Sequence, residues 1–273
     1  MSIKRKIESV GIPLKEWNIQ INYGIKTGCN DAFIISGSKK DELIAEDSKS
    51  AEIIRPILRG RDIKRYGYEF ADLWLIATFP SRHYDIDQYP AVKKHLLSFG
   101  IEKLEQTGEK HIINGEEIHS RKKTNNKWFE TQDSISYWDD FSKQKIIWGN
   151  LCLSAQFAFA EGDYFINAPS PMIVPGNKYI LSVLNSNLAD WYIRKLGVTR
   201  NGGYFEYKPM FVEQLPVPMI DIEKQVIFNN LVDKIEEIKR EGNDSSLIED
   251  QINQMVYMLY NLSDDEIAFI KNT

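Results

Sequence analysis

The sequence is poor in cysteine and has no long apolar run. It carries only Cys29 and Cys152 among 273 residues, too few for a disulfide framework or a four-ligand zinc site. A membrane-spanning helix needs roughly 20 apolar residues in succession, and no apolar segment follows the basic residues 1–6, which excludes a secretory signal. We therefore expect a reduced, cytoplasmic protein with no membrane partner.

Several catalytic and metal-binding patterns are also missing. The sequence has no Gly-x4-Gly-Lys-Ser/Thr loop for nucleotide phosphates and no Gly-x-Ser-x-Gly elbow for a serine nucleophile. The Gly-rich residues 24–28 have the wrong order for a phosphate loop, and we interpret them as a tight turn, although their backbone N–H groups could meet a phosphate. Among four histidines, His111 and His119 could approach each other across a hairpin at Asn114-Gly115. With no cysteine nearby, we expect no metal site.

The net charge of −5 is unevenly distributed along the chain. From Asp221 onward there are 12 acidic and 5 basic residues, which leaves 27 acidic and 29 basic residues before it. The acidity therefore lies in the tail, and a basic surface on the body is not excluded. With 42% hydrophobic and 27% charged residues, the composition is that of a globular chain with a real core.

The apolar pattern changes near residue 219. Before it, short apolar segments alternate with helical ones, whereas the tail has apolar residues only at helical spacing. Ser246 with Glu249, and Ser263 with Glu266, have the spacing of a capping box. We predict an α+β fold, with a strand-rich domain over 1–219 and a helical hairpin plus a final short helix over 220–273. The predicted strands are 19–22, 32–36, 73–77, 145–148, 157–159, 164–166 and 172–174, and the main predicted helices of the body are 3–9, 38–47, 89–106 and 177–196.

Basic residues gather in three segments of the predicted domain. Residues 55–65 hold five cations and one acid, residues 121–129 combine cations with amides and the pair Trp128-Phe129, and residues 199–208 contain Gly202-Gly203. Cations neutralise phosphates, amides contact base edges and flat rings stack on bases. The pattern favours nucleic-acid contact, with a solvated Lys-rich loop as the alternative for residues 121–127.

Six segments together resemble one known family, the TaqI-like C-terminal specificity domain. This is the target-recognition domain of type IIG restriction-modification enzymes and related adenine-specific DNA methyltransferases. The resemblance covers nearly all of residues 6–218, and the tail is similar to the ends of such enzymes and to helices of type I specificity subunits. The matching segments are 6–14, 23–35, 54–66, 89–92, 181–186 and 213–218.

The resemblance implies a function without catalysis. The Asn-Pro-Pro-aromatic motif and the Gly-rich S-adenosylmethionine loop of such methyltransferases are absent, and so is the nuclease part of type IIG proteins. We therefore expect a DNA sequence-recognition module whose partners are double-stranded DNA and a catalytic methyltransferase domain or subunit. S-adenosylmethionine and Mg²⁺ are expected for the parent protein and not for this chain.

The predicted DNA-contacting residues come from the basic segments and from the loop before residue 31. We assign base contacts to the loops 121–128 and 200–208, and backbone positioning or structural support to the block 55–65. The predicted residues are Lys26, Asn30, Arg59, Arg61, Lys64, Arg121, Lys122, Lys123, Asn125, Lys127, Arg200, Tyr204 and Lys208.

Three alternatives remain open. The chain could be half of a type I-like specificity subunit, or a small Mg²⁺-dependent nuclease using Asp139, Asp140 and Lys145. It could also be an interaction module whose helical tail pairs with a partner. For the recognition module, we expect the acidic tail to be separable from DNA contact, so that a chain ending after Met219 would keep its DNA affinity.

Overall fold

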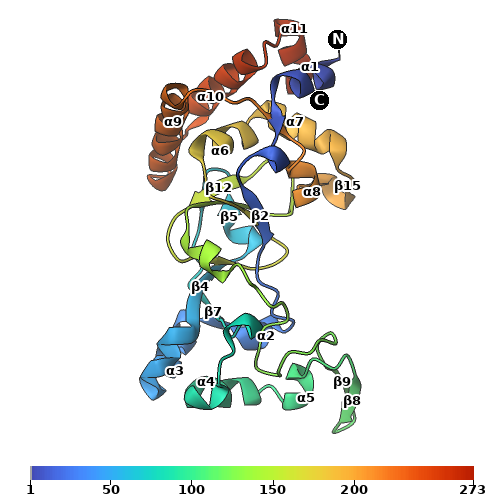
Figure 1. Cartoon of the computed structure of the whole chain (residues 1–273), viewed down its shortest axis with the longest axis vertical. Helices are drawn as coiled ribbons and strands as arrows, with labels where there is room; N and C mark the ends of the chain where they lie inside the picture. Colours follow the sequence, from blue (N-terminus) through green and yellow to red (C-terminus); the bar gives the residue numbers. More distant parts are fainter. Residues whose placement is uncertain (1) are drawn as a thin grey trace.

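A four-stranded antiparallel sheet lies at the middle of the molecule and separates two lobes (Figure 1). The computed structural model describes residues 2–273. The helical lobe contains both chain ends and is drawn at the top of Figure 1, and the small lobe lies at the opposite end. The strands of the central sheet, in spatial order, are β12 (Phe157–Ala160), β10 (Lys145–Trp148), β14 (Pro171–Val174) and β2 (Gln20–Tyr23).

Three strands of the central sheet, β12, β10 and β14, are buried on both faces. Along a strand, successive side chains point to opposite faces; Ile146 and Trp148 of β10 contribute to the core of the helical lobe, while Ile147 contributes to the core of the small lobe. The same alternation separates Phe157 from Ala158 in β12. The uninterrupted apolar runs predicted as strands therefore serve two cores rather than one.

The small lobe is built on a second four-stranded sheet, and two of its elements differ from prediction. Residues 32–36 begin as a short helix and only then become a strand, and the helix expected over 89–106 is broken at Gly100. The φ of Gly100 is +86°, a left-handed conformation that glycine adopts readily. The lobe contains the strands β13 (Phe165–Ile166), β4 (Ile54–Leu58), β7 (Leu73–Ile76) and β3 (Ile34–Ser36), the helices α2 (Asn30–Phe33), α3 (Gly37–Glu46), α4 (Pro90–Leu97) and α5 (Ile101–Leu104), and the hairpin β8 (Lys110–Ile113) and β9 (Glu116–His119).

The helix expected over 177–196 is divided into two helices, because the side chain of Asn185 forms hydrogen bonds with strand β12 of the central sheet. Its side-chain oxygen accepts from the Phe157 N–H at 3.0 Å and its amide nitrogen donates to the Phe157 carbonyl at 2.9 Å. Ser186 then starts the second helix, where its Oγ accepts from the Ala189 N–H. The helical lobe contains α1 (Ile3–Val10), α6 (Lys178–Leu184), α7 (Asn187–Leu196), α8 (Pro209–Val212), α9 (Ile222–Arg240), α10 (Ser246–Leu259) and α11 (Asp264–Lys271).

The C-terminal helices share their core with the body, so they do not pack as an independent unit. Phe228, Val232 and Ile235 of α9 and Val256 of α10 are buried in the same core as the central sheet, and the Tyr260 hydroxyl donates to the Pro216 carbonyl at 2.5 Å. A mixed α+β fold with a helical C-terminal segment is confirmed. Among residues 2–273, no helix is both long and apolar enough to cross a membrane.

Only one of the two expected capping boxes forms. Ser263 and Glu266 cap α11 reciprocally, as predicted. At α10 the N-cap is Ser245 rather than Ser246, and Ser245 Oγ donates to Glu249 Oε1 at 2.7 Å. Ile227 of α9 is 50% exposed, although its helical spacing with Leu231 and Ile235 predicts a position on their buried face.

Candidate nucleic-acid interface

A groove of about 970 Å³ brings together five of the predicted residues. One side is the turn η3 (Gly60–Asp62) with the strand β5 (Ile63–Lys64), and the other is a three-stranded sheet with the loop 149–156. That sheet consists of β11 (Leu151–Cys152), β16 (Tyr204–Glu206) and β15 (Thr199–Arg200). The predicted residues that line the groove are Arg61, Lys64, Arg200, Tyr204 and Lys208.

Glu206 orients two of the four cations of the groove. Its buried carboxylate accepts from Arg200 Nε at 2.6 Å and lies 2.9 Å from Lys208 Nζ. Hydrogen bonds from Lys208 and Arg200 hold the pKa of Glu206 below its ordinary value, so it stays ionised at neutral pH. With Arg61 and Lys64 on the other side, the groove has an excess of positive charge.

Arg59 stabilises the turn and does not line the groove, which agrees with the structural support that was one of the two roles expected of the block 55–65. Its guanidinium contacts Asp62 through Nε at 2.9 Å and Nη2 at 2.7 Å, and its backbone N–H donates to the same carboxylate at 2.8 Å. Asp62 is only 6% exposed, so the pair is well shielded. These contacts fix η3, which presents Arg61 and Lys64 to the groove.

Arg121 is also a structural residue, and its prediction as a base-contacting side chain is wrong. It is 4% exposed, and its guanidinium donates to four backbone carbonyls: Leu104 at 2.7 Å, Thr27 at 2.8 Å, Glu130 at 2.7 Å and Trp128 at 2.6 Å. Burial lowers the pKa of Arg121 to about 10, which leaves it protonated at neutral pH. Four of its five N–H donors are used inside the protein, and its burial keeps the side chain away from the surface.

Arg121 joins two loops that carry the remaining predicted residues. The loop 24–30 crosses over the Arg121 side chain at Gly28, whose φ is +77° and where an added Cβ would lie 2.9 Å from Arg121 Cδ. We call the remaining predicted residues the second cluster; all of them are exposed. They are Lys26 and Asn30 on one loop and Lys122, Lys123, Asn125 and Lys127 on the other.

Several polar residues of the groove could not be predicted from the sequence. Asn150, Gln156 and Asn201 line it. A single amide side chain has no spacing or pattern in the sequence that would indicate a DNA contact. Pro169 lines both this groove and a neighbouring hollow of about 470 Å³ that also contains Lys26. Lys26 therefore lies in a hollow that adjoins the groove.

The residues of the alternative nuclease site have other roles. Lys145 is fully buried, and its Nζ donates to the carbonyls of Phe141 at 2.6 Å and Gly162 at 2.9 Å. Asp140 accepts from Asn22 Nδ2 at 2.9 Å and from Lys143 Nζ at 2.7 Å. These side chains hold loops in place and do not converge on a cleft.

The predicted hairpin around Asn114-Gly115 forms, but its register separates the two histidines. His111 faces Ile118, and His119 faces Lys110. Across residues 2–273, no group of three His, Cys, Asp or Glu side chains is arranged to hold a metal ion.

A groove lined by several cations is typical of surfaces that bind nucleic acids. The family model of the TaqI-like C-terminal specificity domain matches residues 55–217, more than half of the chain, so the chain belongs to this family. It is a specificity domain of this family, a DNA-recognition module.

Two solved structures have a similar fold. The type IIL restriction-modification enzyme MmeI in complex with DNA matches with a TM-score of 0.65 and 13% identity, over 96% of this chain and 36% of the MmeI chain. The type IIG restriction endonuclease BpuSI matches with a TM-score of 0.52 and 14% identity, over 94% of this chain and 32% of its own. This chain thus spans about a third of each enzyme. No curated protein sequence matches it.

Proposed function

We propose that the chain recognises its DNA target by placing the groove against the duplex. The observation that carries this proposal is the convergence of Arg61 and Lys64 with Arg200, Tyr204 and Lys208. These residues lie in two segments more than 130 residues apart in the sequence, yet they line one groove with excess positive charge. A cation-lined groove suits a phosphate backbone, because much of the affinity for DNA comes from neutralised phosphates.

The two sides of the groove suit different contacts. Arg61 and Lys64 are exposed on a rigid turn, which suits phosphates. The loop 200–208 carries Tyr204, 40% exposed, and Asn201, which suit stacking and base-edge contacts. The second cluster, next to the groove, would extend the interface along the duplex.

We propose that catalysis belongs to a methyltransferase part, with or without a nuclease, that works together with this chain. The missing adenine and S-adenosylmethionine motifs support this division. S-adenosylmethionine and Mg²⁺ would then be bound by the catalytic parts. A cytoplasmic location is also proposed, supported by the two cysteines, both of which are free thiols.

Removing the phosphate-facing cations should weaken binding to all sequences alike. For Arg61→Ala or Lys64→Ala, we expect a lower affinity for any duplex and a salt slope reduced by about 1, because one phosphate contact is lost. Titration of a mixed-sequence duplex at several salt concentrations measures both quantities. Lys94→Ala is the matched control, since Lys94 is exposed on α4 and pairs with Glu46. Unchanged binding by both groove variants would contradict the proposal.

Removing a base-contacting residue should instead alter preference. For Tyr204→Ala in the groove or Asn125→Ala in the second cluster, we expect a loss of roughly 1–3 kcal/mol at the preferred target and little change elsewhere. Binding-site selection with wild type and each variant measures this, in a fusion to the catalytic region if the chain alone binds weakly. Identical selected sequences and affinities for wild type and a variant would show that the mutated residue reads no base.

A further inference from the structure

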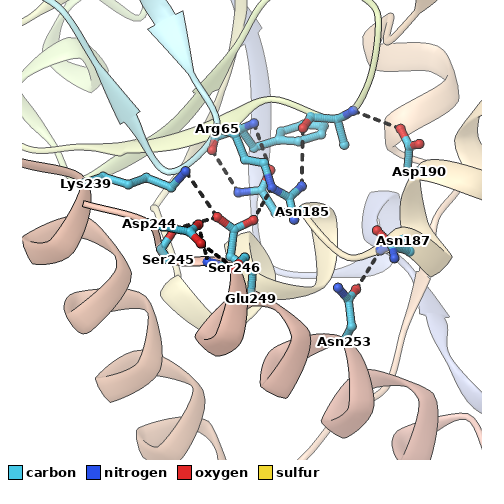
Figure 2. A network of polar contacts seen from close by, with 12 residues as sticks. Arg65, Asn185, Asn187, Asp190, Lys239, Asp244, Ser245, Ser246, Glu249 and Asn253 are labelled. Carbon is cyan, nitrogen blue, oxygen red and sulfur yellow. Dashed lines mark hydrogen bonds and ion pairs between the residues drawn. The ribbon is translucent and has the colours of Figure 1, made fainter. Parts of the chain in front are cut away.

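Glu249, at the start of α10, is the centre of a polar network between the C-terminal helices and the body (Figure 2). Its carboxylate accepts from Arg65 Nε at 2.5 Å, lies 3.1 Å from Lys239 Nζ and accepts from Ser245 Oγ at 2.7 Å. The side chains of Arg65 and Glu249 are 24% and 15% exposed, so solvent screens this pair less than a surface pair.

Arg65 belongs to the tight turn that follows the groove strand β5. This turn joins β5 to β6 (Gly67–Tyr68) through Arg65 and Tyr66. Tyr66 has a φ of +62°, which is unfavourable for a bulky residue and persists only where surrounding contacts hold it. Its ring is buried in the helical lobe and its N–H donates to the Phe157 carbonyl at 2.9 Å. Lys64, which lines the groove, immediately precedes this strained turn.

The opposite side of the groove reaches the same network. Asn253 of α10 accepts from the Asn187 N–H at 2.8 Å, at the start of α7. One turn further along α7, Asp190 accepts from the Ala155 N–H at 2.9 Å and from the Tyr207 hydroxyl. Ala155 lies in the loop 149–156, and Tyr207 follows β16. Figure 2 shows Asn187 next to Asn253 of α10, with Asp190 further along α7.

We propose that Glu249 is a positioning residue for DNA binding: by holding Arg65, it sets the turn that places Lys64 and Arg61 in the groove. The inference rests on the proposed function of the groove. It assigns the acidic C-terminal segment a role in DNA affinity that needs no contact between these helices and DNA.

The carboxylate is charged under the conditions in which DNA binds. Burial alone would raise the pKa of Glu249, but Arg65, Ser245 and Lys239 outweigh burial and lower it. The ion pair is therefore present at neutral pH and is lost only as the pH falls through this lowered pKa.

Glu249→Gln in the full chain tests the inference, with Glu266→Gln as the matched control. Glu266 also joins the C-terminal helices to the body, through Lys6 Nζ at 2.7 Å, but neither residue lines the groove. For a mixed-sequence duplex at low salt, we expect Glu249→Gln to bind about three- to tenfold more weakly, with a salt slope reduced by about 1. Glu266→Gln should bind as wild type does. Near-ultraviolet circular dichroism establishes that both variants are folded.

A double-variant comparison separates positioning from general destabilisation. If Glu249 acts through Arg65, Arg65→Gln combined with Glu249→Gln should lose no more affinity than the larger single loss. Additive losses, unchanged binding by folded Glu249→Gln, or an equal loss in Glu266→Gln would each overturn the inference. If Lys64→Ala weakens binding but Glu249→Gln does not, only the positioning role fails. If neither has an effect, the proposed groove function fails as well.

Discussion

A chain that ends after Met219 should not fold cooperatively. The truncation removes nine apolar side chains from the core of the helical lobe, among them Phe228, Val232 and Val256. Each buried side chain of this size contributes about 1.5–3 kcal/mol, so their combined loss exceeds the roughly 5–15 kcal/mol that stabilises a typical domain. Near-ultraviolet circular dichroism and thermal unfolding of the truncated chain would measure the effect.

A shorter truncation is the matched control for this result. A chain ending after Leu262 loses only α11, whose one fully packed side chain is Ile270, together with the Lys6–Glu266 ion pair. It should remain folded at a lower melting temperature. A cooperative unfolding transition in the chain ending after Met219 would contradict our account of the shared core.

Arg121→Met should destabilise the protein by roughly 3 kcal/mol or more, because it leaves buried carbonyl oxygens without a donor. The four carbonyls belong to α5 and to the loops 24–30 and 121–132, so these segments should loosen together. Denaturant unfolding measures the change in free energy. Any change in DNA binding should arise indirectly, through the second cluster that Arg121 holds in place, because Arg121 itself is buried.

The neighbouring residue supplies a control for Arg121. Lys122 is exposed, and Lys122→Ala should leave the free energy of unfolding within about 0.5 kcal/mol of wild type, as is usual for surface substitutions. A loss below about 1 kcal/mol for Arg121→Met would mean that the four hydrogen bonds contribute little.

Elements with a strong apolar pattern could be predicted from the sequence. The strands around Ile146 and Ile173 form as expected, because a run of large apolar residues bounded by loops has few other stable arrangements. Breaks within elements could not be predicted. Asn185 ends a helix because its side-chain amide forms hydrogen bonds with an edge strand distant in sequence, and such tertiary hydrogen bonds leave no periodic signal. The break near Gly100 depends instead on a left-handed backbone conformation, which the apolar pattern does not show either.

The site could be predicted only in part, because charge in a sequence does not reveal whether a side chain is exposed. Arg61 and Arg121 both lie among other cations in the sequence, yet one lines the groove and the other is buried. The difference depends on carbonyls that come together only in the folded chain, such as those of Thr27 and Leu104. Arg59 is a contrasting case. Asp62, three residues later, is near enough in the sequence to pair with it, so this local ion pair is one that the sequence can indicate.

The central sheet has a consequence for how the two lobes unfold. Its strands give alternate residues to both cores, as Ile146 and Ile147 do in adjacent positions. If the small lobe opened alone, one face of β10 would meet water while the other stayed packed, and the strand would lose half of its support. Melting of either lobe therefore weakens the other. The groove is formed by elements attached to both lobes, so we expect it to be lost in the same cooperative step as the rest of the fold.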